Sequence, residues 1–199
     1  MPAEMTPDRR RFLALGGVAA LAVVGACGTK NDSSGEATAT TTTSIAPSAA
    51  DVAFLRNASS LEELEVALYK KALDGGLLKT PAVLETVKLF QAQHQNHAAL
   101  FEGHTTRLGG PPDAQPNAAL RGRLASATDE ASVLRLAVDL ALATTATYQS
   151  GVGVVSDPAL SVVLMSIAGV EARHAALLGT MINVPVAPAS FATTERAVR

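Results

Sequence analysis

The stretch FQAQHQNHAALFEGH (Phe90–His104) carries three of the four histidines in the chain, at positions 94, 97 and 104. On a helix, these positions continue a stripe that begins at Val83, ends at Leu108 and advances in steps of four and three. Such steps describe the inward face of a bundle helix. The histidines therefore stand where leucines are expected, and burying a polar group without a partner costs roughly 1–3 kcal/mol. We expect polar partners for them on the other helices.

The composition suits a helical domain. The 199 residues allow one domain plus attachments, and the apolar content is high, with few aromatic residues and no tryptophan. Alanine, leucine and valine fill helix–helix contacts more readily than they fill a twisted sheet. The net charge is −2, and no basic cluster occurs beyond the first dozen residues. These values argue against nucleic-acid binding.

Residues 1–27 are predicted to be an export signal. Arg9 and Arg10 lead into an apolar run that resembles a twin-arginine signal of bacteria, and the run from Phe12 to Ala26 is too short to span a bilayer. Cys27, the single cysteine, ends the run in a segment similar to a lipoprotein processing box. We expect a lipidated Cys27 that attaches an exported, extracytoplasmic protein to the membrane. The alternative is a buried cysteine in an uncleaved helix.

The rest of the chain divides into a tether, a bundle and a tail. Residues 28–50 are rich in Ser, Thr and Ala and are predicted to be a disordered spacer. Residues 51–183 contain four helical patterns, at 51–74, 81–108, 128–154 and 158–183, and residues 184–199 form a C-terminal tail. Thr80 and Asp157, each followed by proline, are the expected N-caps. A long connection separates the second and third patterns, with a short helical piece expected at 118–124. The fold class is therefore all-α: an antiparallel four-helix bundle with one long crossover.

The two halves of the bundle repeat a short motif. The second helix has His94-x-x-His97-Ala-Ala-Leu, and the fourth has Glu171-x-x-His174-Ala-Ala-Leu. Each motif follows a tyrosine of the preceding helix by a similar distance, and these are the two tyrosines of the chain. Counted from the helix ends at 1.5 Å per residue, the motifs lie at one mid-bundle level. We expect six side chains to converge there as a metal site, those of Glu62, Glu65, His94, His97, Glu171 and His174.

This arrangement resembles the ferritin-like superfamily of carboxylate-bridged di-iron proteins. The family pattern is one Glu from each of two helices and Glu-x-x-His from each of the other two. Glu62 matches the first-helix glutamate, His97 the second-helix histidine, and Glu171 with His174 the fourth-helix motif. Tyr69 follows Glu62 as in the family, and we expect both tyrosines, Tyr69 and Tyr148, to lie beside the ligands.

Two positions depart from the family pattern. His94 replaces the second-helix glutamate, and Ala141 replaces the third-helix glutamate. The remaining donors suit a single Fe, Mn or Zn ion, or an asymmetric pair, better than a conventional di-iron centre. Glu65 is on the right face to add a ligand, and Thr144 is its counterpart on the third helix. His104 is expected to be an ordinary hydrogen-bonded histidine, and Glu130 to lie on a solvated helix face.

Two functions remain open on the sequence. The first is a membrane-attached metalloprotein that, if it is an enzyme, is a metal-dependent oxidoreductase. The second is a metal-free envelope lipoprotein whose bundle serves as a binding or scaffolding module. Iron storage in a closed shell is disfavoured by the N-terminal anchor and tether. A homodimer, a protein partner and the substrate are left undecided.

Overall fold

The computed structural model describes residues 49–185 and 193–198. The described chain forms four long helices: α1 (Ala49–Asp74), α2 (Pro81–Arg107), α3 (Glu130–Gly151) and α4 (Pro158–Met181). A short 3-10 helix, η2 (Arg121–Ser126), interrupts the connection between α2 and α3. Within these residues there is no strand, so the predicted all-α class is confirmed.

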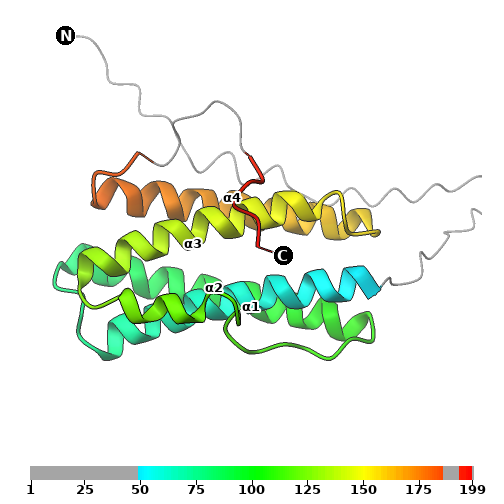
Figure 1. Ribbon diagram of the computed structural model, residues 1–199, viewed down its shortest axis with the longest axis horizontal. Coiled ribbons are helices and arrows are strands. Elements are labelled where there is room, and N and C mark those ends of the chain that lie inside the picture. Colours follow the sequence, from blue (N-terminus) through cyan, green and yellow to red (C-terminus); the bar gives the residue numbers. More distant parts are fainter. Residues whose placement is uncertain (1–48, 186–192, 199) are drawn as a thin grey trace, which may run out of the picture. The chain divides into compact units, whose positions relative to one another are not determined.

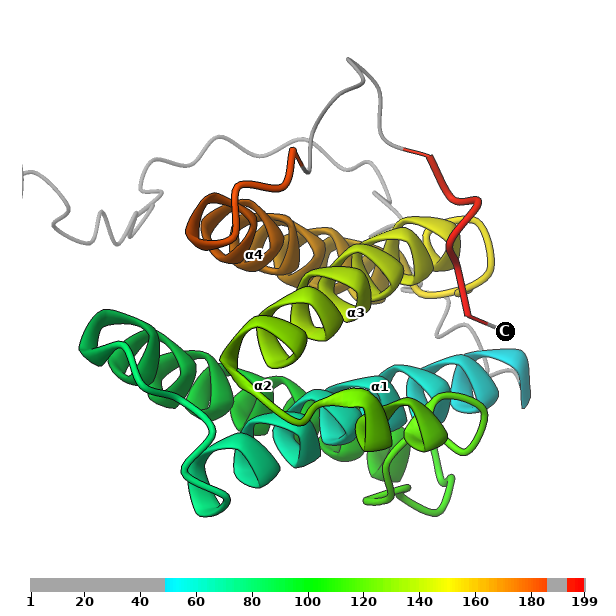
Figure 2. The ribbon, with the colours of Figure 1, turned by 60° about the vertical axis from the view of Figure 1, so that its left-hand side comes forward.

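The helices pack as two antiparallel pairs. α1 lies along α2 and α3 along α4, while α1 also packs against α3 and joins the pairs. Figure 2 shows the two pairs lying one over the other. The connection after α2 runs back along the bundle before α3 begins, which is the predicted long crossover (Figure 1). The structure is therefore the expected bundle with short, long and short connections.

The buried face of α2 differs from the predicted stripe in its second half. Its buried residues include Ala98, Phe101 and Thr105, whereas His97 and His104 are only partly buried. A repeat of seven residues drifts by about 20° around a straight α-helix with each repeat. Val83, Phe90, His97 and His104 are seven residues apart, so the drift accumulates along this row and carries the two histidines at its end to the edge of the core. In α1 and α3, by contrast, buried residues follow steps of three and four along the helix: Leu55, Ala58, Glu62, Glu65, Tyr69 and Ala72 in α1, and Leu134, Ala137, Ala141, Thr144, Tyr148 and Gly151 in α3.

Helix α2 is capped by a residue of another helix. Thr80 is its N-cap, as predicted, but the threonine side chain makes no capping bond within α2. Instead, the Glu130 carboxylate accepts hydrogen bonds from the Lys79 and Thr80 N–H groups, at 2.5 and 2.8 Å, and from Thr80 Oγ1 at 2.6 Å. Glu130 is partly exposed at the start of α3, and it satisfies donors that α2 leaves unpaired. The interpretation of Glu130 as a merely solvated residue was therefore incomplete.

The crossover and the tail are both fixed to α1. Asn117 donates its N–H to Ser60 O at 2.8 Å, and its side-chain amide donates to Asn57 Oδ1 and Ser60 Oγ. In the tail, Val198 donates its N–H to Thr147 Oγ1 of α3 at 2.8 Å and accepts from Asn57 Nδ2 of α1 at 2.9 Å. The described part of the tail thus bridges α1 and α3 one turn from Glu62.

The core consists of two apolar clusters separated by a polar layer. One cluster contains Leu68, Phe90 and Leu140, and the other contains Phe101 and Leu164. Burying one such side chain stabilises the fold by about 1.5–3 kcal/mol. α4 is apolar enough, by length and composition, to cross a membrane, but 44% of its most apolar window is buried in the bundle. We therefore regard α4 as a core helix. The polar layer between the clusters contains the predicted site.

Candidate metal centre

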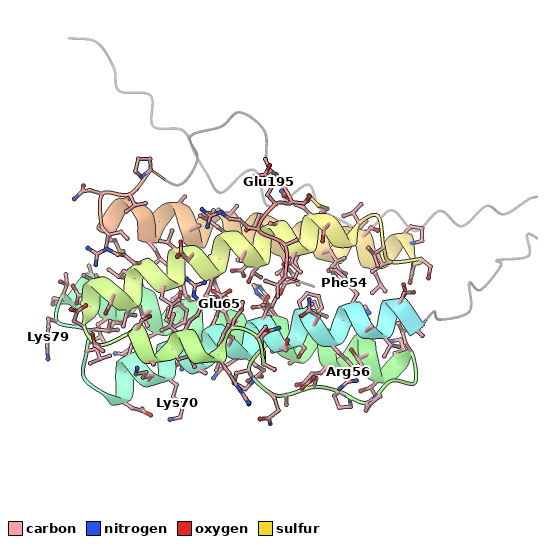
Figure 3. All side chains as sticks on the ribbon, viewed as in Figure 1. Phe54, Arg56, Glu65, Lys70, Lys79 and Glu195 are labelled. Carbon is pink, nitrogen blue, oxygen red and sulfur yellow. The ribbon has the colours of Figure 1, made fainter. Side chains whose placement is uncertain are left out.

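The six predicted ligands all lie in this polar layer. Five of them expose 2% or less of their surface, and the sixth, His97, exposes 14% of its side chain. Figure 3 places Glu65 near the middle of the bundle's length. Because the layer lies on α1, α2 and α4 at matching heights, the convergence expected from the two His-containing motifs is what the structure shows.

Four donor atoms of this layer form a closed ring. His94 Nδ1 lies 2.6 Å from Glu62 Oε2 and 3.7 Å from Glu171 Oε1. His97 Nδ1 lies 3.5 Å from Glu62 Oε2 and 3.2 Å from Glu171 Oε1. One ligand atom from each of the four residues lies within 4.8 Å of all the others. These atoms come from three helices and enclose a common point.

The far side of the His94 ring faces a third carboxylate. His94 Nε2 lies 3.2 Å from Glu65 Oε2, and the other oxygen of Glu65 accepts a hydrogen bond of 2.9 Å from Thr144 Oγ1. Thr144 is the α3 counterpart of Glu65. It orients the carboxylate toward the imidazole, so the two nitrogens of His94 face two different carboxylates.

Both tyrosines adjoin the layer in different ways. The Tyr148 hydroxyl donates a short hydrogen bond to Glu62 Oε1, the oxygen that does not face the histidines. The Tyr69 ring lies 5.6 Å from the His94 ring, and its buried hydroxyl has no hydrogen-bond partner among the described residues. Burial, followed by the charges of the nearby carboxylates, raises the pKa of each tyrosine well above its usual value. Both hydroxyls therefore remain protonated at neutral pH.

His174 is held by a residue that the sequence interpretation did not single out. His174 Nε2 lies 2.6 Å from Gln93 Oε1, and Phe90 stacks on its ring at 3.8 Å. With the amide oxygen as acceptor, Nε2 carries a proton, and Nδ1 faces Glu171 Oε2 at 3.3 Å. Gln93 was missed because it lies beside the stripe of three- and four-residue steps. Its position immediately before His94 was the only available signal.

Burial and mutual attraction shift the proton equilibria of the site. Burial alone lowers the pKa of His94, but the carboxylates of Glu65, Glu171 and Glu62 outweigh it and raise the value to about 10. In the same way, Glu171 and Glu62 outweigh burial and raise the pKa of His97 to about 9. Burial raises the pKa of Glu65 to about 8. For Glu171 burial is outweighed by His94 and His174, and its pKa falls to about 2. The buried carboxylates are thus stabilised by nearby positive charge, which either protonated histidines or a bound cation can supply.

The donor set fits a transition-metal ion. Several buried polar atoms of the layer have no hydrogen-bond partner among residues 49–185 and 193–198: Glu65 Oε2, His94 Nε2, His97 Nδ1, Glu171 Oε1, Glu171 Oε2 and His174 Nδ1. A tetrahedral ion with ligands at 2.0–2.2 Å requires neighbouring donors about 3.3–3.6 Å apart. The four contacts of the ring run from 2.6 to 3.7 Å. Imidazole and carboxylate donors suit Zn, Fe and Mn.

Other predicted residues lie outside the ring. Ala141 is completely buried and supplies no donor, and the partly exposed member of the site is His97. His104 is half-buried, with Nδ1 3.3 Å from the Arg107 guanidinium, and burial together with that charge lowers its pKa. Arg9, Arg10 and Cys27 lie outside the described residues, as does the predicted tether up to residue 48.

Comparison with known proteins agrees with this architecture. A family model described as a ferritin-like domain matches residues 50–184, which include every residue of the polar layer and all of the described helices except the first residue of α1. The comparisons with curated proteins and with solved structures gave no match. The matched segment is more than half of the chain, and it contains the four long helices and the Glu/His group described above. The chain belongs to the ferritin-like domain family.

Proposed function

We propose that this chain is an exported, lipid-anchored ferritin-like protein that binds an Fe, Mn or Zn ion at the centre of its bundle. The observation that carries the metal proposal is the ring of four donor atoms from Glu62, His94, His97 and Glu171, all within 4.8 Å of one another. Two carboxylates and two neutral imidazoles would balance the charge of a divalent ion.

The cost of the arrangement without an ion supports the proposal. Three carboxylates and three histidines occupy a layer in which most atoms are sealed from water. Buried ion pairs seldom stabilise a fold better than apolar residues of the same volume. Metal binding therefore explains why these polar residues are buried, whereas packing alone does not. When bound, such an ion would supply Lewis acidity or, for Fe and Mn, redox chemistry, which places any enzymatic activity among the metal-dependent oxidoreductases.

The N-terminal sequence supports the location. Arg9 and Arg10 resemble a twin-arginine signal, and Cys27 ends the apolar run. The tether between Cys27 and α1 has 21 residues, counted from position 28 to position 48. Fully extended, it reaches about 70 Å. The bundle would therefore be held near the outer face of the membrane without being embedded in it.

A metal-free binding or scaffolding module is the alternative. It is favoured by one contact, the 2.6 Å approach of His94 Nδ1 to Glu62 Oε2, which is a hydrogen-bond distance and needs no ion. If the layer is a proton-held network, the protein binds no stoichiometric metal under any condition of loading.

Elemental analysis separates the two functions. The full chain with Cys27→Ser, purified without chelator and exposed in turn to Fe, Mn and Zn, should retain stoichiometric metal. His97→Ala should lose it, because one donor of the ring is removed. His104→Ala, seven residues further along α2 and outside the ring, is the matched control and should retain it. A parent protein without bound metal after all three exposures would reject the metal proposal in favour of the scaffold.

A second experiment tests the anchor. The unsubstituted chain should partition with the membrane fraction and incorporate labelled palmitate, and Cys27→Ser should do neither. A parent that is unlabelled and fully soluble after export would contradict lipidation and leave the metal proposal untouched.

A further inference from the structure

The six polar residues of the layer do not play equal parts. We propose that the centre takes one ion, coordinated by Glu62, His94, His97 and Glu171, while Glu65 and His174 are positioning residues that hold the coordinating groups. This inference rests on the proposed metal function and defines its ligand set. It departs from the two-ion arrangement that the family resemblance implies.

The geometry of the ring fits one ion. Each carboxylate oxygen of the ring contacts both histidine nitrogens, and each histidine nitrogen contacts both oxygens. Two carboxylate oxygens and two imidazole nitrogens thus surround a single point, as the ligands of a four-coordinate ion do. The 2.6 Å contact between Glu62 and His94 is shorter than the tetrahedral spacing of about 3.3–3.6 Å. A bound ion would therefore increase the distance between these two atoms by roughly 1 Å, as the same coordination distances require.

The described residues outside the ring form no second group of three or more donors. Outside the ring, the remaining contacts are pairs: His94 Nε2 with Glu65 Oε2, and His174 Nδ1 with Glu171 Oε2. Within the described part of the chain, only the ring brings three or more metal-binding groups together. In α3, where the family pattern has a glutamate, Ala141 is buried without a donor. The His94 ring itself lies between Glu62 and Glu65, so these two carboxylates do not face a common point.

The ligand atoms that face away from the centre have partners of their own. Histidine ligands commonly donate their second N–H to a carboxylate, which fixes the tautomer and the ring orientation. Glu65, supported by Thr144, stands in this place behind His94. Tyr148 holds the outer oxygen of Glu62 in the same way.

Behind the third ligand, His174 faces the outer oxygen of Glu171 and is itself held by Gln93. Three of the four ligands thus have a buried partner. The fourth, His97, is the ligand that reaches solvent.

The number of ions per chain tests the inference. The full chain carrying Cys27→Ser is saturated with Co²⁺ or Zn²⁺ and examined by native mass spectrometry, and the Co²⁺ form by visible absorption and EPR. We expect one ion per chain, a four-coordinate cobalt spectrum and no magnetic coupling between ions. Two ions per chain would overturn the inference while leaving the metal function intact, and no ion would overturn the metal function itself.

Conservative variants test the division of roles. Glu65→Gln and His174→Gln should still bind one ion with the parent's cobalt spectrum, and with affinity lower by about 10–100-fold, as for other partners behind metal ligands. Glu171→Gln should change the spectrum or lose the ion. If Glu65→Gln does not fold, Thr144→Val removes only the support of Glu65 and should show the same loss of affinity. A changed cobalt spectrum in His174→Gln or in Thr144→Val would overturn the assignment.

Discussion

His94 Nδ1 lies 2.6 Å from Glu62 Oε2, at the position of α2 where the ferritin-like pattern has a glutamate. At this position the chain therefore has a contact between an acid and an imidazole. The second ring nitrogen faces Glu65, 3.2 Å away. One side chain thus separates two buried carboxylates and offers a single donor to the centre.

Removal of this imidazole should destabilise the metal-free protein strongly. His94→Ala removes the imidazole that faces both Glu62 and Glu65 and leaves His97 as the remaining histidine beside Glu62, and breaking a buried pair costs about 3–5 kcal/mol. Urea denaturation of chelator-treated protein measures the loss. His104→Ala, at a partly exposed position of the same helix, should change the free energy of unfolding by less than about 0.5 kcal/mol. Equal losses in the two variants would show that the His94 contacts do not hold the layer.

The cap that Glu130 supplies to α2 should give a pH-dependent contribution to stability. Hydrogen bonds from Thr80 and Lys79 lower the pKa of Glu130 below 4.5. A lowered folded-state pKa means that the contribution is present above about pH 4.5 and is lost as the pH falls through the folded value. Glu130→Gln should therefore cost about 1 kcal/mol at pH 7 and progressively less in acid.

Denaturation at several pH values checks the Glu130 prediction. The matched control is Glu85→Gln, because Glu85 pairs only with Lys88 on an exposed face of α2. Such pairs contribute about 0–1 kcal/mol. A Glu130→Gln effect that does not diminish in acid would contradict the capping role.

Two helical glycines should respond to alanine in opposite directions. At Gly151 an added Cβ would lie 2.2 Å from Phe54 Cζ and 2.8 Å from Leu164 Cδ1, and Phe54 projects from α1 toward α3 (Figure 3). Gly151→Ala should destabilise the bundle by about 1–3 kcal/mol. Gly169 in α4 has open space, so Gly169→Ala should stabilise the protein by about 0.4–1 kcal/mol. Thermal unfolding checks both signs, and destabilisation by Gly169→Ala would indicate that this face of α4 is covered.

Metal binding should raise the stability of the parent by mass action. A free ion concentration of 100 times Kd adds about 2.7 kcal/mol to the free energy of unfolding. Thermal melting with and without Zn²⁺ should therefore show an increase in Tm for the parent and for His104→Ala, and no increase for His97→Ala. A rise of equal size in His97→Ala would place the ion outside the proposed ring.

Much of the fold could be predicted from the sequence because local rules decide it. The apolar stripes predicted the four helices, and the prolines after Thr80 and Asp157 predicted where two of them begin. The cap from Glu130 could not be predicted, because it joins residues 50 positions apart. The convergence of the acidic and histidine side chains followed from the heights of the motifs along the bundle.

The division of that layer could not be predicted from spacing. Both nitrogens of an imidazole share one sequence position, and only the packing of neighbouring helices decides which carboxylate each nitrogen faces. Gln93 was missed for a related reason: its contact with His174 crosses from α2 to α4, and no motif places it there. The edge position of His97 arises from the drift of a seven-residue spacing around the helix.

Anomalous diffraction from crystals of the metal-loaded protein, collected at the absorption edge of the ion, tests the central claim most directly. The account predicts one peak per chain at the middle of the bundle. That peak should lie about 2.0–2.2 Å from Glu62 Oε2, His94 Nδ1, His97 Nδ1 and Glu171 Oε1. Two peaks within the layer would contradict the single-ion centre. No peak within the layer, in crystals grown at saturating metal, would contradict metal binding itself.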